Sequence, residues 1–503
     1  MAAETRRLLI RGGRVYDHDG DVHQPPIADI LIDGSTIKAI GANLPASQTQ
    51  GAQVIDAAGR LIVPGLINAH YHSHDVLCRG LFEELPLEFW LLYTLPMGAN
   101  RSADEIRART LVGALESIRC GITCVQDMLG MVPFADDYVD TVLKAYRDCG
   151  IRVVFSPMVS DIPPVGMVRY RELLPPDIQD MLGTKALGID EQLAFLEHQI
   201  RRYPAQDTLH WAVAPFAPQR CSPKMLEACQ AFADKHDLQI YTHVYETRGQ
   251  RLIANDLFAD YKGSFIEYFA IAGLLGPRLN IVHSVWIERA EMDRLAAAGS
   301  GIVLNHLSNL KLKSGIAPVL DMRASGVRLA LGCDNCSGSD VQNMFQAMKT
   351  FALFGAVSDP EPTPGLAAEA LRHGTLGSAR TAGLGDALGA LRPGRKADMF
   401  LVDTGDIAWL PFNSAARQLV YTETGRAIET VIVDGRVVMK DRKITTIDED
   451  ALRREIAGLM KRFIVDYDAV VKSRERALPH MLAAHRRVWS QDLKLQRFIA
   501  RTL

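Results

Sequence analysis

Short apolar runs recur at regular intervals through the middle of the chain. Between about residues 64 and 384 they alternate with amphipathic stretches such as 102–121 and 222–237. Runs of this length, separated by helical patterns, are typical of parallel strands joined by helices. Eight runs predict an α/β fold, a (β/α)₈ TIM-type barrel. The predicted strands are 66–72, 122–127, 152–159, 209–215, 239–245, 280–285, 301–307 and 327–334.

Both ends of the chain have a different pattern of apolar and polar residues. Apolar and polar residues alternate with period two over residues 8–63 and again over 391–441, with Gly and Asp-Gly turns between the runs. This pattern predicts a small composite β-sandwich domain formed by residues 1–63 and 385–445, beside a barrel domain of residues 64–384. Residues 446–503 read as a helical C-terminal extension, which we expect to pack on the body or on a partner subunit.

Composition and charge narrow the range of functions. Hydrophobic residues make up 48% of the 503 residues and charged residues 23%, with a formal net charge of −3. There is no basic field for nucleic acid and no apolar run of the ~18 residues that a membrane span needs. The first residues lack the apolar core of a signal peptide. We therefore expect a cytoplasmic protein with a small-molecule substrate and neither nucleic acid nor membrane as partner. We also expect a homo-oligomer, a dimer or tetramer, with the C-terminal tail as the candidate contact, although composition and charge do not show this.

Candidate chemistry lies at the ends of the predicted strands. The stretch NAHYHSHD places His70, His72 and His74 at alternate positions, and alternate residues of a strand face the same side. His243, His283 and Asp334 also end apolar strands, where buried polar groups are costly without partners. Because active sites of such barrels lie at the carboxyl ends of the strands, one bound divalent ion would satisfy these groups together. The alternative is a polar loop that happens to contain histidines.

Several motifs carry a resemblance to a known family. The stretch VIDAAGRLIVPGLINAHYHSH resembles the opening of the amidohydrolase superfamily. The stretches LCRGLFEELPLEFWL, THVYET, VHSVWI, SNLKLKSGIAP, LGCDNCSGSDVQNMF and GALRPGRKADMFLVD resemble its triazine hydrolase and nucleobase deaminase branch. The resemblance covers residues 8–445 in the expected order, and it implies the barrel and composite β-domain described above.

The resemblance also implies a role for each polar residue at the strand ends. Asp334 would take a proton from a metal-activated water, Glu246 would carry it to the leaving nitrogen, and His283 would steady the attacking group. In the superfamily that the chain resembles, members with two metal ions bridge them with a carboxylated lysine on the fourth strand. The corresponding strand here, TLHWAVAP, has no lysine, so the resemblance implies one metal ion rather than two. Zinc suits these ligands best, with iron(II) or manganese(II) as alternatives. The implied metal ligands are His70, His72, His243 and Asp334.

The remaining predictions concern the substrate. A cleft rich in apolar and aromatic side chains suits a flat neutral ring, and the departures from the family pattern at Lys313, Asn335, Gly338 and Ser339 leave the particular ring open. The leading hypothesis is removal of an exocyclic amino or alkylamino group from a purine, pyrimidine or triazine-like ring. Alternatives are hydrolysis of an aryl amide, urea or carbamate at the same site, or a non-enzymatic scaffold. The expected substrate contacts are His74, Phe82, Trp90, Phe216, Gln219 and His306, although His74 could instead support a loop and His306 could be a buried structural residue.

Overall fold

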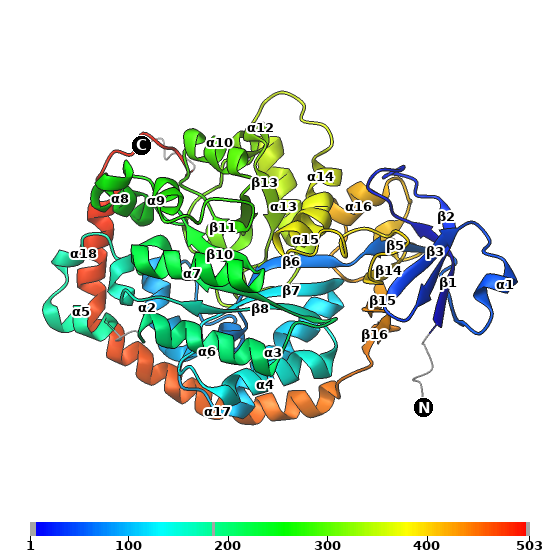
Figure 1. The fold of residues 1–503 in the computed structure, drawn as a ribbon, viewed down its shortest axis with the longest axis horizontal. Coiled ribbons are helices and arrows are strands. Elements are labelled where there is room, and N and C mark those ends of the chain that lie inside the picture. The colour runs from blue at the N-terminus through cyan, green and yellow to red at the C-terminus, as the bar shows by residue number, and fades with distance from the viewer. Residues whose placement is uncertain (1–6, 184–186, 499–503) are drawn as a thin grey trace.

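An eight-stranded parallel sheet forms the body of the computed structural model, which describes residues 7–183 and 187–498 (Figure 1). Its strands follow chain order around the sheet, each paired with the next. All eight overlap the predicted strands, so the predicted barrel is confirmed. They are β6 (Leu66–Tyr71), β7 (Ile122–Leu129), β8 (Arg152–Val159), β9 (Leu209–Pro215), β10 (Gln239–Val244), β11 (Leu279–His283), β12 (Gly301–Leu304) and β13 (Arg328–Leu331).

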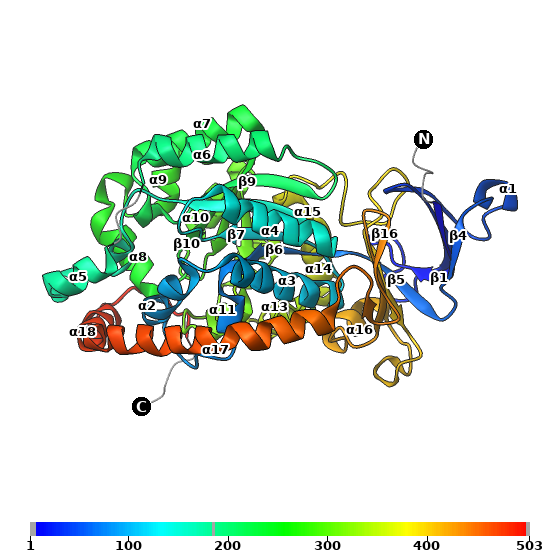
Figure 2. The ribbon, with the colours of Figure 1, turned by 90° about the horizontal axis from the view of Figure 1, so that it is seen from below.

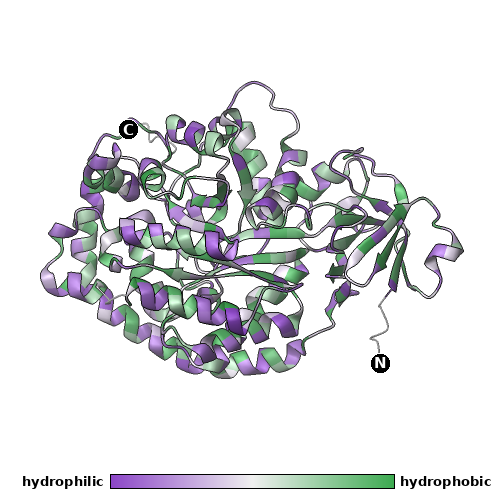
Figure 3. Cartoon of the chain, viewed as in Figure 1, coloured by the Kyte–Doolittle hydropathy of each residue, from purple (hydrophilic) through white to green (hydrophobic). Residues whose placement is uncertain are grey.

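Alternation along the strands separates two cores. On β7, Cys124 and Met128 belong to the cluster inside the barrel, whereas the alternate residues Val125 and Leu129 belong to the cluster outside it. Small residues such as Ala212 and Ala330 let the inner cluster fit the narrow barrel interior. Figure 3 shows the strands predominantly hydrophobic and the surrounding helices mixed along their length. This is the pattern expected for strands buried on both faces.

Helices cover the outside of the barrel (Figure 1). The helix α3 begins with a capping box in which Ser102 and Glu105 each accept from the other's backbone N–H. The larger covering helices are α2 (Leu87–Gly98), α3 (Ala103–Arg119), α4 (Asp136–Cys149), α6 (Ile189–Arg202), α7 (Pro223–His236), α8 (Arg248–Leu257), α10 (Arg289–Ala298) and α13 (Met344–Val357). The shorter helices α9 (Phe265–Ile271), α11 (His306–Lys311), α12 (Val319–Ser325), α14 (Leu366–Arg372) and α15 (Ser378–Thr381) lie in the second half of the barrel.

The two ends of the chain form one mixed sheet of nine strands beside the barrel. The strand β14 joins its two halves by pairing antiparallel with β5, so that Met399 lies opposite Pro64. Met399 and Leu401 face the core of this sheet, while Phe400 and Val402 face the main core. The strands are β1 (Arg7–Val15), β2 (Ile27–Asp33), β3 (Thr36–Gly41), β4 (Gln53–Asp56), β5 (Arg60–Pro64), β14 (Met399–Asp403), β15 (Ile428–Val433), β16 (Arg436–Lys440) and β17 (Lys443–Ile444).

The C-terminal helices run back along the barrel. Figure 2 shows α17 (Glu449–Arg474) crossing the molecule from the small sheet to α18 (Leu478–Trp489) at the opposite end. Three ion pairs bind α17 to the barrel: Arg101–Asp466 at 2.8 Å, Arg107–Glu455 at 2.6 Å and Arg119–Glu449 at 2.7 Å. The predicted helical tail is therefore confirmed, and it packs on its own chain. In the ranges that the structure describes, no helix has both the length and the hydropathy needed to cross a membrane.

Candidate metal centre and active site

A local irregularity in β6 turns two histidines toward the barrel axis. Ala69 belongs to the interior cluster and Tyr71 to the outer one, and the pairing register with β7 shifts between Asn68 and Tyr71. This shift lets His70 follow Ala69 on the inner side, with His72 two residues further on. Both rings are buried, His70 completely. The alternation of the motif NAHYHSHD thus becomes a pair of imidazoles at the carboxyl end of β6.

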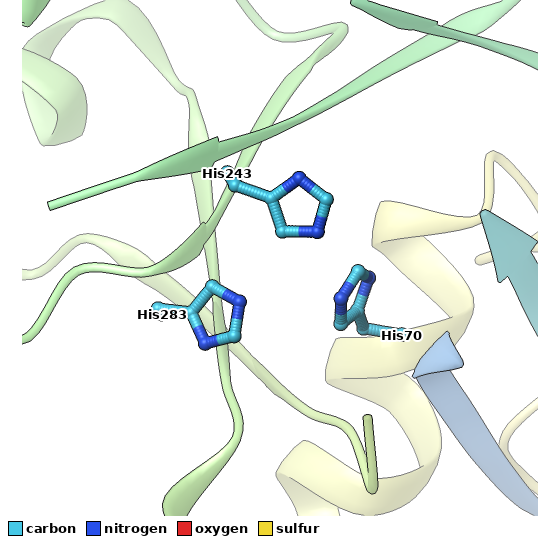
Figure 4. A group of neighbouring side chains, drawn as sticks. All are labelled: His70, His243 and His283. Carbon is cyan, nitrogen blue, oxygen red and sulfur yellow. The ribbon is translucent and has the colours of Figure 1, made fainter. Parts of the chain in front are cut away.

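Side chains from three other strands meet this pair. The imidazoles of His70, His243 and His283 point toward one another in Figure 4. The Asp334 Oδ1 atom lies 3.4 Å from the Nε2 atoms of both His70 and His72, and the Nε2 atoms of His72 and His243 are 3.4 Å apart. Donor atoms at such separations can share one ion. In the groups His70–His243–His283 and His70–His72–Asp334, the possible ligand atoms all lie within 4.8 Å of one another.

A second carboxylate lies next to this group. The Glu246 Oε2 atom is 3.6 Å from the Nε2 atom of His283, which is itself 3.9 Å from Asp334 Oδ2. His283 and Asp334 both have left-handed backbone conformations, with φ of 75° and 63°. Bulky or charged residues adopt this region only where the surrounding structure enforces it, most often at functional sites.

The pKa values of the two carboxyl groups are shifted in opposite directions. Burial, the charge of Asp334 and that of Glu88 raise the pKa of Glu246 well above its ordinary value. Burial also acts to raise the pKa of Asp334, but the hydrogen bond and charge of His70, together with the charges of His283 and His72, hold that pKa well below the usual range. Paired groups whose pKa values are driven apart serve as acid and base in many hydrolases.

The donor set fits a divalent cation. The Nδ1 atom of His243 is bound to the carbonyl oxygen of Phe216 at 2.7 Å, that of His72 to the carbonyl oxygen of Met128, and that of His283 to Asn309 Oδ1 at 2.9 Å. Each ring is thereby oriented with Nε2 toward the centre, as metal-ligating histidines require. Neither ring nitrogen of the buried His70 makes a hydrogen bond within the described residues. A cation would satisfy the nitrogen that faces the centre.

A cavity opens onto this group of residues. His72, His243, Glu246, His283 and Asp334 form its polar end. Its remaining wall is apolar or aromatic with few polar groups, as is common in sites for small flat ligands. That wall consists of His74, Leu87, Trp90, Leu91, Thr94, Leu95, Met158, Met167, Phe216 and Asn335.

The expected substrate contacts divide into two groups. His74, Trp90 and Phe216 line the cavity, whereas Phe82, Gln219 and His306 are not among its lining residues. Phe82 stacks on Tyr93 and lies edge-on to Tyr467 of α17, so it belongs to the core beneath the loop. Gln219 is buried in the turn after Phe216. His306 packs against phenylalanines of α13, and burial lowers its pKa to about 3.

Some residues near the site carried no readable signal in the sequence. Met158 and Met167 read as ordinary apolar positions, yet both line the cavity. Asp75 follows the histidine motif in a loop, and its buried carboxylate accepts several hydrogen bonds. It accepts from the backbone N–H groups of Cys336 and Ser337 and from the Ser337 hydroxyl, and Ser337 Oγ in turn accepts from the Trp90 indole at 2.9 Å. One buried carboxylate thus connects the loops after β6 and β13 with the cavity wall.

Known proteins share this architecture. The model of the amidohydrolase family matches residues 61–438. A 5'-deoxyadenosine deaminase of Methanothermobacter thermautotrophicus is 31% identical over 447 residues, 89% of this chain and 96% of that protein.

Two solved structures match at 25% identity. An adenosine deaminase from Xanthomonas campestris with bound zinc has a TM-score of 0.79 over 91% of this chain and 98% of that one. The atrazine chlorohydrolase from Arthrobacter aurescens, complexed with zinc, has a TM-score of 0.77 over 92% and 100%. The family predicted from the motifs is confirmed: the chain belongs to the amidohydrolase family and is a hydrolase of carbon–nitrogen bonds.

Proposed function

We propose that the chain removes an exocyclic amino or alkylamino group from a nitrogen heteroaromatic ring by hydrolysis. The observation that carries this proposal is that Glu246 and Asp334 both lie within 4 Å of His283 Nε2, with pKa values driven in opposite directions. A nitrogen leaving group needs a proton as it departs, so a carboxyl group that holds its proton is the required partner.

We propose one zinc ion at this site, held by His70, His72, His243 and Asp334. When bound, a divalent cation supplies a water of lowered pKa as the nucleophile at neutral pH. Asp334, which is ionised, accepts a proton at its free oxygen. Glu246 retains a proton and lies within reach of His283, where it can protonate the leaving nitrogen. Because Asn309 Oδ1 accepts from Nδ1–H, His283 presents the lone pair of Nε2, which accepts a hydrogen bond from the group that adds to the ring and orients it. Zinc, rather than iron or manganese, is supported by the zinc bound in two similar structures.

The cavity wall supports a flat ring as substrate. Trp90 and Phe216 offer aromatic faces, and Met158 and Met167 adapt to an irregular outline. His74 supplies a directed polar contact. The backbone N–H of Gly130 donates to His74 Nδ1 at 3.1 Å, so Nδ1 is the acceptor and the ring proton resides on Nε2. We therefore propose that His74 donates to an acceptor of the substrate, a ring nitrogen or a carbonyl oxygen.

The substrate class can be tested with a panel of aminopurines, aminopyrimidines and amino-triazines, including nucleosides of adenine because several relatives bear the name of adenosine-type deaminases. We expect release of ammonia or amine from at least one class. A zinc-loaded protein that releases neither from any member would refute the proposal. Carboxylate, carbon dioxide or aniline released from aryl amides, ureas or carbamates would favour the alternative reaction.

We also propose that the protein is a cytoplasmic homo-oligomer, a dimer or tetramer. Exposed apolar side chains on α13, Leu353 and Val357, would gain from burial against another copy. Light scattering of the purified chain tests this directly, and a monomer mass at micromolar concentration would exclude it.

A further inference from the structure

Three of the four histidines at the centre share one arrangement. His72, His243 and His283 each place Nδ1 against an oxygen of the protein and turn Nε2 inward. A neutral imidazole carries a single N–H, so an acceptor for Nδ1–H leaves the Nε2 lone pair free for a metal. His70 is buried like the others, but neither of its nitrogens makes a hydrogen bond of good geometry within the described residues. Its Nδ1 atom needs an acceptor if Nε2 is to bind a metal.

Gln126 of β7 is a polar side chain next to His70, because Val125 pairs with Asn68 and Asp127 pairs with Tyr71 in the neighbouring strand β6. It lies between Cys124 and Met128, which face the barrel interior, and its exposed fraction is 1%. The Gln126 Oε1 atom is buried and without a partner among the described residues. A buried amide oxygen without a partner is costly, so its presence in the barrel interior indicates a specific task.

The orientation of this amide is fixed from the opposite side. The Gln126 Nε2 group donates to Ser156 Oγ at 2.6 Å, and Ser156 Oγ lies 3.5 Å from the carbonyl oxygen of Val154, the acceptor available to its proton. Because the serine proton is directed to Val154, its oxygen acts as the acceptor for Gln126. The amide therefore turns its NH₂ group to Ser156 and its oxygen to His70. A flipped amide would present a donor to Nδ1 and place the ring proton on Nε2, where it would block metal binding.

We infer that Gln126 is the positioning residue of His70, whose Nδ1–H it accepts so that Nε2 faces the metal. This inference rests on the proposed metal site and assigns no contact between Gln126 and the substrate. It completes the arrangement: each of the four histidines then has an oxygen acceptor behind it, two of them carbonyls of the main chain and two of them side-chain amides. Acceptors of this kind commonly account for 10–100-fold in metal affinity.

The test measures zinc affinity rather than turnover. The metal-free protein and the variants Gln126→Leu, Gln126→Glu and Ser156→Ala are titrated with zinc against a chelating dye. We expect Gln126→Leu to bind zinc about 10–100-fold more weakly, Ser156→Ala to bind a few-fold more weakly because the amide can rotate, and Gln126→Glu to stay close to the wild type. The matched control is Gln192→Leu, the same change at a buried glutamine that bonds the backbone of Ser160 and Leu187.

The outcomes separate this inference from the proposed function. Gln192→Leu should lower the melting temperature and leave zinc affinity unchanged, which gauges the effect of instability alone. Wild-type affinity in folded Gln126→Leu would overturn the positioning role, and if that variant does not fold, wild-type affinity in Ser156→Ala would do the same. A wild-type protein that binds no zinc would overturn the proposed metal site itself.

Discussion

The backbone N–H of Asp334 donates to the carbonyl oxygen of His70 at 2.9 Å, which joins the end of the last barrel strand to the first. Cys333 N–H adds a second link by donating to Asn68 Oδ1 at 2.9 Å. These bonds lie directly behind the side chains that meet at the centre. The carboxylate of Asp334 and the ring of His70 are therefore placed by the same hydrogen bonds that close the barrel, so the fold and the site depend on each other.

Replacing Glu246 by Gln should lower kcat by about 10²–10⁴-fold, because the leaving nitrogen loses its proton donor. The amide has the size of the protonated carboxyl, so the fold and zinc binding should be retained. Steady-state kinetics on whichever heterocycle proves to be a substrate, with zinc content measured in parallel, checks this expectation. Glu227→Gln, an exposed change on α7, serves as the control.

The same variant has a predicted effect on stability. Because the pKa of Glu246 is raised in the folded protein, the unfolded chain loses this proton at lower pH than the folded one. The stability of metal-free wild type should therefore fall as pH rises above the ordinary glutamate pKa of about 4.3. Glu246→Gln should remove this part of the pH dependence and raise the melting temperature near pH 7. Parallel curves for the two proteins between pH 5 and 8 would contradict the raised pKa.

The tautomer of His74 predicts how variants should discriminate between substrates. His74→Leu removes the Nε2–H donor and should lower kcat/KM by about 10–100-fold for a ring that presents an acceptor, in line with about 1.5–3 kcal/mol for an unpaired polar group. An analogue with C–H in place of that acceptor should be turned over equally by both proteins. His74→Gln, which retains a donor, should recover part of the loss. An equal loss on both rings would show that His74 only supports the loop.

The buried hydrogen bonds of Asp75 should contribute to the stability of the folded protein. Asp75→Ala leaves the buried N–H groups of Cys336 and Ser337 without acceptors, which should cost about 2–4 kcal/mol in the free energy of unfolding. It also frees Ser337, so that Trp90 loses its fixed partner and KM should rise. Urea denaturation and KM together check this. Asp75→Asn keeps one acceptor oxygen, so its urea midpoint should lie between those of the alanine variant and wild type. An unchanged urea midpoint for Asp75→Ala would show that these hydrogen bonds do not stabilise the fold.

Arg497 connects the C-terminal segment to the site. Its guanidinium donates to the carbonyl oxygens of Val285 and Ile287, in the loop that follows His283. Arg497→Ala should destabilise the protein by about 1–3 kcal/mol and lower kcat, since the loop that holds His283 loses two bonds. Lys494→Ala, an exposed change in the same segment, should have no effect on either quantity. If the two variants behave alike, the segment does not support the site.

Much of this architecture was predictable from the sequence because the signals are local. Each barrel strand is an apolar run, and a histidine or aspartate at the end of such a run stands out, as His243 does in QIYTHVY. The relation of strand ends to one edge of a barrel then brings distant residues together. The family motifs supplied the order and the roles.

The features that could not be predicted depend on the conformation of loops and on side chains from different strands that face each other. Phe82 and Trp90 read alike as aromatic residues of one loop, but only Trp90 lines the cavity. His306 lies next to the end of β12, yet the chain enters α11 there and carries the ring to α13. Gln126 reads as one more polar residue in a strand, and its role depends on His70 from another strand. No hydrophobic period or motif spacing in the sequence indicates that two side chains from different strands will lie together.

The central claim is that His70, His72, His243 and Asp334 hold a single divalent ion. Metal analysis and zinc titration of the metal-free protein test it most directly, with wild type, His243→Ala and the control His236→Ala, a change at a half-buried histidine at the end of α7. The account predicts one zinc ion per chain for wild type and for His236→Ala, and binding at least 100-fold weaker for His243→Ala. A wild-type chain without bound metal, or a folded His243→Ala chain that binds zinc as tightly as wild type, would contradict it.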